Sequence, residues 1–212
     1  MFIKSSMKYK TFLLFGSPGS GKGTQGLILG RVPGYFHCSC GDVFRSVDLT
    51  SDIGKEFMEY SSHGSLVPDD VTIKLWQTSI KGKELTRNFK TEADFLILDG
   101  IPRNVEQARY LDNELDVLLV FHLVCPDKKK LMERLKKRAI KDNRHDDANE
   151  EVIKHRLKVY EDESKPVLDF YGRDKVININ AEQRPDQVLN DILHYTTKLT
   201  PASSGEPKNY TT

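Results

Sequence analysis

The sequence predicts an α/β fold in which a parallel β-sheet is covered by helices on both faces. Short apolar runs alternate with helical patterns along the 212 residues, and each run is rich in Val, Ile, Leu and Phe. Such runs are typical of strands that are buried on both faces. The first run leads directly into a glycine-rich loop and then a helix, an arrangement that binds phosphate. The length fits a single domain with small inserts.

The elements can be placed in order from these runs and from the helical periodicity between them. We expect strands at Thr11–Phe15, Phe95–Leu98, Val117–Val124 and Lys175–Asn180, with a weaker candidate at Tyr35–Ser39. We expect helices at Lys22–Leu29, Gly41–Val47, Ile53–Ser62, Asp70–Ile80, Val105–Asn113, Asp127–Arg138, Glu150–Tyr171 and Asp186–Lys198. Candidate N-caps are Asp69 or Asp70 before one helix and Asp127 before another. Trp76 is expected to pack in the core.

The two ends of the chain differ from its centre. Residues 1–9 and 200–212 lack apolar periodicity, so we expect both to be disordered and 10–199 to form the folded domain.

Composition excludes several classes of function. The 32 basic and 31 acidic residues give a formal net charge of +1, which predicts no nucleic-acid or membrane partner. Balanced charge without an obvious apolar patch favours a monomer. The three cysteines, Cys38, Cys40 and Cys125, are odd in number, and no apolar run is long enough for a secretory signal or a membrane span. We therefore expect reduced thiols in the cytoplasm. Cys38 and Cys40 lack a second pair and are interpreted as structural.

The glycine-rich loop is the most specific motif. It reads Gly-Ser-Pro-Gly-Ser-Gly-Lys-Gly-Thr from Gly16 to Thr24. Glycines allow successive backbone N–H groups to turn inward, the helix N-terminus adds partial positive charge, and Lys22 adds a full one. In most such loops Ser or Thr follows the lysine at once, whereas Gly23 intervenes before Thr24 in this chain. A merely structural turn would not need all of these residues.

Three predicted strands end next to polar or glycine residues that could form one site. Gly16, Ser39 and Asp99 each lie at the carboxyl end of a strand. Ligands of parallel sheets bind beyond these ends, so we expect the three positions to converge on one crevice. The Asp99 carboxylate would emerge beside the phosphate loop, where it could hold the water shell of Mg²⁺.

Several arginines follow these strand ends. Arg45 lies one turn into the helix after Ser39, and alone it would be interpreted as a solvated helix residue. Gly100 and Pro102 bend the chain so that Arg103 can point back at the crevice. Four more occur later in the chain, at Arg134, Arg138, Arg144 and Arg156. As isolated charges these too would be solvated, but around a loop beside a phosphate cradle they are better interpreted as a clamp on phosphate.

These motifs together resemble the nucleoside monophosphate kinases, above all the adenylate kinase family, in the family's own order over roughly residues 11–198. The first motif is the loop, which has the family's form G-x-P-G-x-G-K-G-T. Ser39-Cys40-Gly41-Asp42-x-x-Arg45 corresponds to the family motif S-T-G-D-x-x-R, and the Gly64–Asp69 turn follows it. Asp99-Gly100-Ile101-Pro102-Arg103 corresponds to the family motif D-G-F-P-R, and Arg144-x-Asp-Asp … Arg156-Leu157 corresponds to the last one. Cys40 replaces the usual Thr, which leaves only backbone contacts to the acceptor base there, and Ile101 replaces Phe.

The resemblance implies a P-loop NTPase-like parallel sheet with a small helical insert at 39–68, which binds the monophosphate, and a short lid at 138–147 without structural zinc. It implies Mg²⁺ with ATP as cofactor and ATP, AMP and ADP as substrates. The implied ATP-binding residues are Gly19, Ser20, Gly21, Lys22, Gly23, Thr24, Arg134, Arg138 and Arg184. The implied AMP-binding residues are Ser39, Cys40, Arg45, Ser65, Leu66, Val67, Gly100, Ile101, Pro102, Arg103, Gln107, Arg144 and Arg156. The implied catalytic residues are Lys22, Arg103, Arg138, Arg144 and Arg156, with Asp99 holding Mg²⁺ through water.

Two sequence cues disagree about the acceptor base. The amide of Gln107 can donate and accept, which suits the edge of adenine, and pyrimidine-specific relatives carry Asn at this place. Asn104, however, follows the arginine as it does in UMP/CMP kinases. We weight Gln107 more heavily, so the expected reaction is ATP + AMP = 2 ADP, with a UMP/CMP kinase as the alternative. A nucleotide-hydrolysing switch or motor subunit, or a non-catalytic nucleotide-binding module, is a rival from another class.

Overall fold

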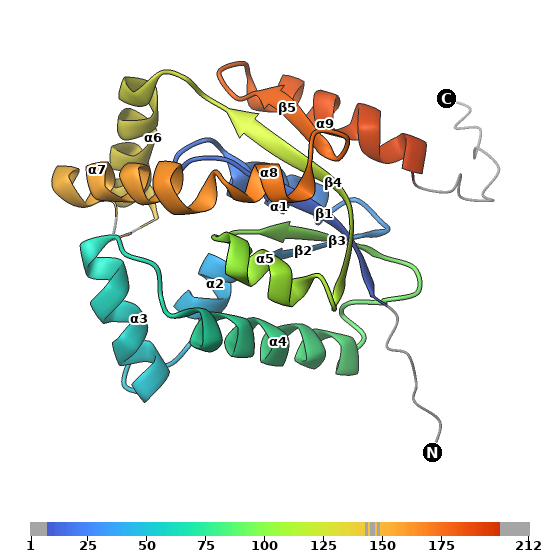
Figure 1. Cartoon of the computed structure of the whole chain (residues 1–212), viewed down its shortest axis with the longest axis horizontal. Helices are drawn as coiled ribbons and strands as arrows, with labels where there is room; N and C mark the ends of the chain where they lie inside the picture. Colours follow the sequence, from blue (N-terminus) through green and yellow to red (C-terminus); the bar gives the residue numbers. More distant parts are fainter. Residues whose placement is uncertain (1–7, 143, 145–146, 148, 200–212) are drawn as a thin grey trace, which may run out of the picture.

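A computed structural model of the protein describes residues 8–142, 144, 147 and 149–199. Five parallel strands form one sheet in the order β2-β3-β1-β4-β5 (Figure 1). The strands are β1 (Tyr9–Phe15), β2 (Tyr35–Ser39), β3 (Phe95–Asp99), β4 (Leu115–Val124) and β5 (Val176–Asn180). The expected fold class is confirmed. β1 begins at Tyr9, which the sequence assigned to the N-terminal extension, whereas residues 1–7 and 200–212 lie outside the described part.

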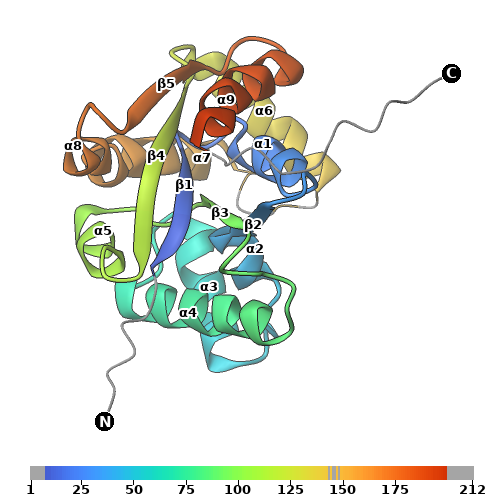
Figure 2. The same cartoon turned by 90° about the vertical axis from the view of Figure 1, so that its right-hand side faces the viewer.

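Helices cover both faces of this sheet (Figure 2). They are α1 (Lys22–Leu29), α2 (Cys40–Arg45), α3 (Asp52–His63), α4 (Asp69–Leu85), α5 (Val105–Leu111), α6 (Lys128–Lys141), α7 (Glu150–Val159), η2 (Tyr160–Ser164, a π-helix), α8 (Val167–Tyr171) and α9 (Pro185–Leu199). Buried side chains of α1, α6 and α9 pack in the cluster on one face, and those of α4, α5 and α8 pack in the cluster on the other.

Alternation along the strands produces these two clusters. In β1, Phe12 and Leu14 belong to the cluster with α1, α6 and α9, whereas Leu13 and Phe15 belong to the opposite one. Successive side chains of a strand point to opposite faces, so a strand that is apolar at every position contributes to both. Trp76 on α4 is fully buried in the core, as expected.

The helix starts differ in how they are capped. The Asp127 side chain accepts hydrogen bonds from the N–H groups of Lys129 and Lys130, as predicted for an N-cap. The prediction for Asp69 and Asp70 was wrong, because both lie inside the first turn of α4 and Pro68 occupies the N-cap without a side-chain bond. Acidic side chains in a first turn still interact favourably with the helix dipole.

The single helix predicted over Glu150–Tyr171 was wrong. The segment divides into α7, η2 and α8, and the backbone N–H of Lys165 donates to the Tyr160 carbonyl at 2.8 Å, five residues back. Pro166 lacks an N–H, so it cannot donate the next hydrogen bond of the ladder, although Lys165 and Pro166 themselves keep helical backbone angles. Helical periodicity alone did not reveal this interruption.

Within the described residues, no helix is both long and apolar enough to cross a membrane. The three cysteines are free and buried.

Candidate active site

A cavity of about 660 Å³ opens beyond the carboxyl ends of the strands. Gly16, Ser39 and Asp99, from three strand ends, all line it, so the predicted convergence is confirmed. The sheet order explains this, because β1 lies next to β3 and β3 next to β2, and parallel strands bring their carboxyl ends to one edge.

Lys22 holds its ammonium group inside the glycine-rich loop. Its Nζ donates to the carbonyls of Gly16 at 2.7 Å and Ser17 at 3.1 Å. The side chain therefore folds back over the loop that precedes it. A phosphate in the cavity would meet this ammonium group together with the backbone N–H groups at the start of α1.

Two glycines give the loop its shape. Gly19 has φ +83° and Gly21 has φ +101°, conformations that side chains with a Cβ rarely adopt. A Cβ at Gly19 would also lie 2.9 Å from the Leu131 carbonyl oxygen of α6, whereas a Cβ at Gly21 would meet no atom within 4 Å. Gly19 is thus needed for close packing, and Gly21 for conformation alone.

The electrostatics of the cavity centre on Lys22. Its pKa is lowered to about 8, mainly by burial; the charges of Arg138, Arg103 and Arg156 contribute to the lowering, and the charge of Asp99 opposes it. Like charges destabilise one another unless an anion lies between them. The cavity is therefore prepared for a strongly anionic ligand.

Asp99 ends β3 beside the loop, as predicted. Its side chain is 7% exposed, and its Oδ2 would lie 3.7 Å from a Cβ placed at Gly23. The glycine between Lys22 and Thr24 thus leaves space open next to this carboxylate. No cluster of three or more His, Cys, Asp or Glu that could hold a metal occurs in the described part of the chain.

Helix α2 presents the first part of the predicted acceptor side. The Ser39 hydroxyl caps the helix by accepting from the Asp42 N–H at 3.3 Å. The Asp42 carboxylate binds Arg45, and its Oδ1 lies 3.9 Å from a guanidinium nitrogen of Arg144. Arginines from two distant segments therefore share one carboxylate at this wall of the cavity. Burial raises the pKa of the Cys40 thiol to about 11, so it is an uncharged group here.

Arg103 is held in place by its own loop. Its Nε donates to the Gly100 carbonyl at 2.8 Å, and its backbone N–H donates to Gln107 Oε1 at 2.8 Å. The other end of the Gln107 amide donates to Asp69 Oδ1 at 2.7 Å, and Asn104 donates to both oxygens of Asp69 at 3.0 Å. Gln107 is 1% exposed and does not line the cavity. Its contact with a base remains a prediction.

The last arginines form a second cationic wall. Asp147 is fully buried and pairs with Arg138 at 2.6 Å and with Arg156. We call Arg138, Arg144 and Arg156, with Asp147, the arginine clamp. One Arg138 guanidinium nitrogen is buried without a hydrogen-bond partner among the described residues. Leaving such a donor unpaired is unfavourable, and an anionic ligand would satisfy it.

Arg134 and Arg184 differ from the clamp. Arg134 lines the cavity and donates to the Ala181 carbonyl at 3.0 Å and to the Gly19 carbonyl at 3.5 Å, which connects α6 to the loop after β5 and to the phosphate loop. Arg184 is exposed, pairs with Asp186 at 3.0 Å and does not line the cavity, although Gln183 and Pro185 on either side of it do.

Most predicted site residues thus share one cavity. The exceptions are Ile101, Gln107 and Arg184. Asn143, His145, Asp146 and Ala148, which belong to the predicted lid or adjoin it, lie outside the described residues. Sequence reasoning missed Lys137 and Lys141, which line the cavity from α6, and Tyr160, which lines it from η2. Lys137 and Lys141 follow Arg134 and Arg138 by three residues, so helical spacing could have placed them on the same side of the helix as the arginines. No sequence pattern pointed to Tyr160.

Comparison with known proteins agrees with this geometry. Residues 14–176 match the family described as adenylate kinase. An adenylate kinase of Corynebacterium glutamicum is 39% identical over 183 residues, covering 83% of this chain and 93% of the relative. Adenylate kinase isoenzyme 1 of Gallus gallus is 36% identical over 193 residues, covering 90% and 96%. The chain therefore belongs to the adenylate kinase family of nucleoside monophosphate kinases.

Proposed function

We propose that the protein transfers a phosphoryl group reversibly between ATP and AMP, giving two molecules of ADP. The observation that carries this proposal is the convergence of cationic side chains from distant segments on one cavity with the phosphate loop. These side chains are Lys22, Arg45, Arg103, Arg134, Arg138, Arg144 and Arg156. A nucleotide-hydrolysing switch binds one nucleotide and would need phosphate ligands for the donor alone, without a second set for an acceptor.

The chemistry suits this residue set. Phosphoryl transfer spreads negative charge over the moving oxygens, so positioning and electrostatic stabilisation carry most of the catalysis. In our assignment Lys22 and the loop N–H groups hold the donor phosphates, and Arg134 assists them. Arg45 and Arg103 hold the acceptor phosphate. The arginines of the clamp neutralise the group in transfer.

Mg²⁺ is the expected partner of the donor. Asp99 supplies the carboxylate oxygen beside the loop, and such a ligand suits a cation that keeps most of its own waters. Bound there with ATP, the ion would neutralise charge on the phosphate oxygens.

Water must be kept from the transferring group. We infer that residues 39–68 and 138–147 close over the monophosphate and the donor respectively. Both segments contribute cavity-lining residues, among them Phe57, Leu66 and Lys141. Closure excludes water and commonly limits turnover.

The acceptor preference follows from Gln107. Its amide orientation is set by Arg103 and Asp69, which leaves one N–H and one oxygen lone pair for a further partner. This pattern matches an adenine edge once the acceptor site closes. Asn104 is occupied by Asp69 and is less suited to contact a base.

The deciding experiment is a coupled assay of diphosphate formation with AMP, CMP, UMP and GMP. We expect the highest kcat/KM with AMP. A preference for CMP or UMP would establish the UMP/CMP kinase alternative. Consumption of ATP at the same rate without any monophosphate would support a hydrolytic switch.

We further infer that the protein acts as a monomer in the cytoplasm. Its reduced thiols and balanced charge support this inference. Sedimentation equilibrium at micromolar concentration would show a single 24.2 kDa species, and a concentration-dependent dimer would contradict it.

A further inference from the structure

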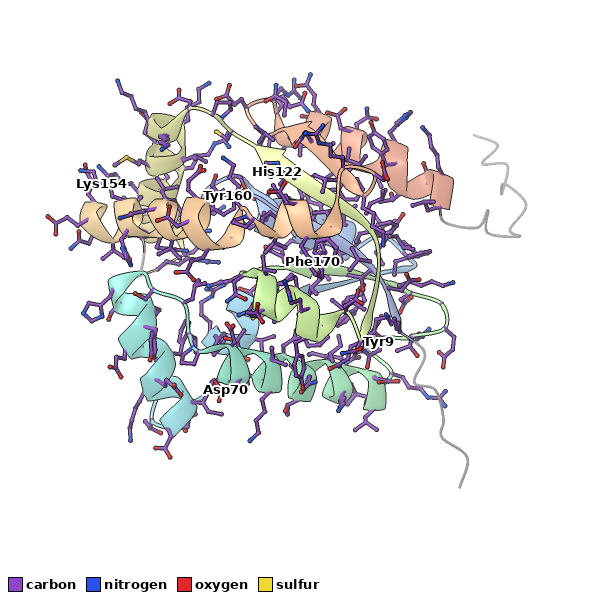
Figure 3. All side chains as sticks on the ribbon, viewed as in Figure 1. Tyr9, Asp70, His122, Lys154, Tyr160 and Phe170 are labelled. Atoms are coloured by element: carbon purple, nitrogen blue, oxygen red, sulfur yellow. The ribbon has the colours of Figure 1, made fainter. Side chains whose placement is uncertain are left out.

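The connection between the arginine clamp and the sheet passes through a hydrogen-bonded network that the mechanism above does not use. Tyr160 is the first residue of η2 and is 8% exposed at the cavity wall. Its hydroxyl lies 3.0 Å from Nε2 of His122 on β4; both side chains are labelled in Figure 3. Nδ1 of His122 lies 2.8 Å from Asn178 Oδ1 on β5. His122 and Asn178 are register partners of adjacent strands.

The direction of these bonds follows from their chemistry. An amide oxygen only accepts, so the ring proton of His122 is on Nδ1 and is donated to Asn178. In the neutral ring Nε2 is then an acceptor, and the Tyr160 hydroxyl donates to it. Burial lowers the pKa of His122, and the charges of Lys165 and Lys22 also lower it, whereas the hydrogen bond that the ring donates to Asn178 and the charge of Glu161 raise it. The ring is therefore neutral near pH 7.

Tyr160 also touches the strand that leads into the phosphate loop. Its ring centroid lies 6.0 Å from that of Phe15, the residue directly before Gly16. Arg156 precedes Tyr160 by one helical turn, so both side chains project from the same side of this segment and both line the cavity. Tyr160 thus connects the helix that carries a clamp arginine to the base of the phosphate loop.

The other contacts of α7 combine apolar packing with polar pairs on its surface and at the clamp: Glu150 pairs with Lys136 at 2.8 Å, and Arg156 pairs with Asp147. Ile153 and Leu157 pack in the cluster with Leu131 and Leu135 of α6. Apolar contacts are not directional, whereas a hydrogen bond to a ring held between two strands fixes both distance and orientation. The π-helical turn at this point is the kind of interruption often found at functional sites.

We propose that Tyr160 and His122 are positioning residues for phosphoryl transfer. They hold the end of α7 against β4 and so set the place of Arg156 relative to the phosphate loop. Neither residue contacts the reacting atoms in this role. The inference rests on the proposed function, because it concerns the alignment of the same clamp.

Tyr160→Phe is the main test, with Tyr171→Phe as its matched control. The Tyr171 hydroxyl is also buried, but it has no hydrogen-bond partner among the described residues. We expect Tyr160→Phe to lower kcat about tenfold while KM for both nucleotides changes less than about twofold, since small misplacements of reacting groups reduce rates steeply. Tyr171→Phe should leave kcat and KM unchanged. Circular dichroism melting verifies that both variants are folded.

A double-variant cycle with His122→Leu tests whether the two residues act together. The single variants and the double variant should show similar losses of kcat, because each removes the bond between the Tyr160 hydroxyl and His122 on which the proposal depends; His122→Leu also removes the bond to Asn178. His122→Gln, which keeps hydrogen-bonding groups, should recover part of the loss.

Equal kcat values for Tyr160→Phe and Tyr171→Phe would overturn the proposal. So would a loss confined to KM, or losses that multiply in the double variant. These outcomes are separate from failure of the proposed function, in which the unaltered protein itself would form no diphosphate from any monophosphate.

Discussion

The phosphate loop and the arginine clamp place positive charge on the same cavity in different ways. In the loop, the Lys22 ammonium is held by backbone carbonyls only five and six residues away. In the clamp, Arg138 and Arg156 come from two helices and meet at one buried carboxylate, Asp147. The loop is therefore shaped by local backbone geometry, whereas the clamp exists only when α6 and α7 are packed together. Removing a clamp residue should therefore reduce either the stability of the clamp or the rate of phosphoryl transfer. Altering the loop should instead change its backbone strain or the protonation of Lys22.

The largest effect is expected for Arg144→Ala, which removes a clamp charge. An arginine that neutralises the transferring phosphoryl group contributes about 10³–10⁵ in rate, so we expect kcat to fall by at least about 10³. Its ion pairs with Asp42 and Asp142 are long, at 3.9 and 3.8 Å, so the thermal midpoint should change little. Arg109→Ala on α5, which removes an exposed pair with Glu106, should leave kcat unchanged. A collapse of the midpoint with activity retained would refute the catalytic role.

Asp147→Asn should destabilise the clamp itself. Removing one member of a buried ion pair leaves the partner charges uncompensated, and we expect the free energy of unfolding to fall by about 3–5 kcal/mol. Urea denaturation measures this change. Asp186→Asn, which breaks the exposed pair with Arg184, should reduce it by less than about 1 kcal/mol. If both variants lose the same amount, the clamp does not depend on its buried carboxylate.

Gly21→Ala tests the backbone of the phosphate loop. Nothing lies within 4 Å of the added methyl group, so the effect comes from the φ of +101° alone. Such strain costs about 1–2 kcal/mol of stability. Gly82→Ala, inside α4 and equally open, should be neutral or stabilising by up to about 1 kcal/mol. Similar values for the two glycines would mean that the loop conformation is not under strain.

The smallest effect concerns the protonation of Lys22. With a pKa of about 8, this lysine is largely neutral at pH 8.5 in the free protein, and a bound polyphosphate favours its charged form. Donor binding should therefore take up a fraction of one proton at pH 8.5 and almost none at pH 6.5. Calorimetric titrations in buffers of different ionisation enthalpy measure this uptake. Lys22→Met should abolish the difference between the two pH values, and uptake that persists in this variant would assign the proton to another group.

Prediction from the sequence succeeded where the signal is local. The glycine spacing from Gly16 to Thr24, the apolar runs of the five strands and the Asp127 cap are each encoded within a few neighbouring residues. The same holds for Asp99 at the end of β3. Such features depend on backbone propensity and on the alternation of side chains along a strand, and both can be recognised in a short stretch of sequence.

Contacts between residues that are distant in the sequence were not predicted. Helical spacing could not reveal that the Gln107 amide donates to Asp69, 38 residues earlier in the chain. One local feature was missed as well: the predicted helix divides at Tyr160, although Pro166 was a usable signal in the sequence. Sequence reasoning quoted Asp147 within a motif but did not assign it a role.

By itself, then, the sequence determined the sheet, the phosphate loop and the set of cationic residues, because each is written in short-range patterns of glycine, apolar and basic side chains. Only the tertiary structure decided which carboxylate holds which arginine, where α7 ends, and that Tyr160 meets His122. The physical reason is that hydrogen bonds and ion pairs act over a few ångströms, and only packing brings residues that are far apart in the chain to within that distance.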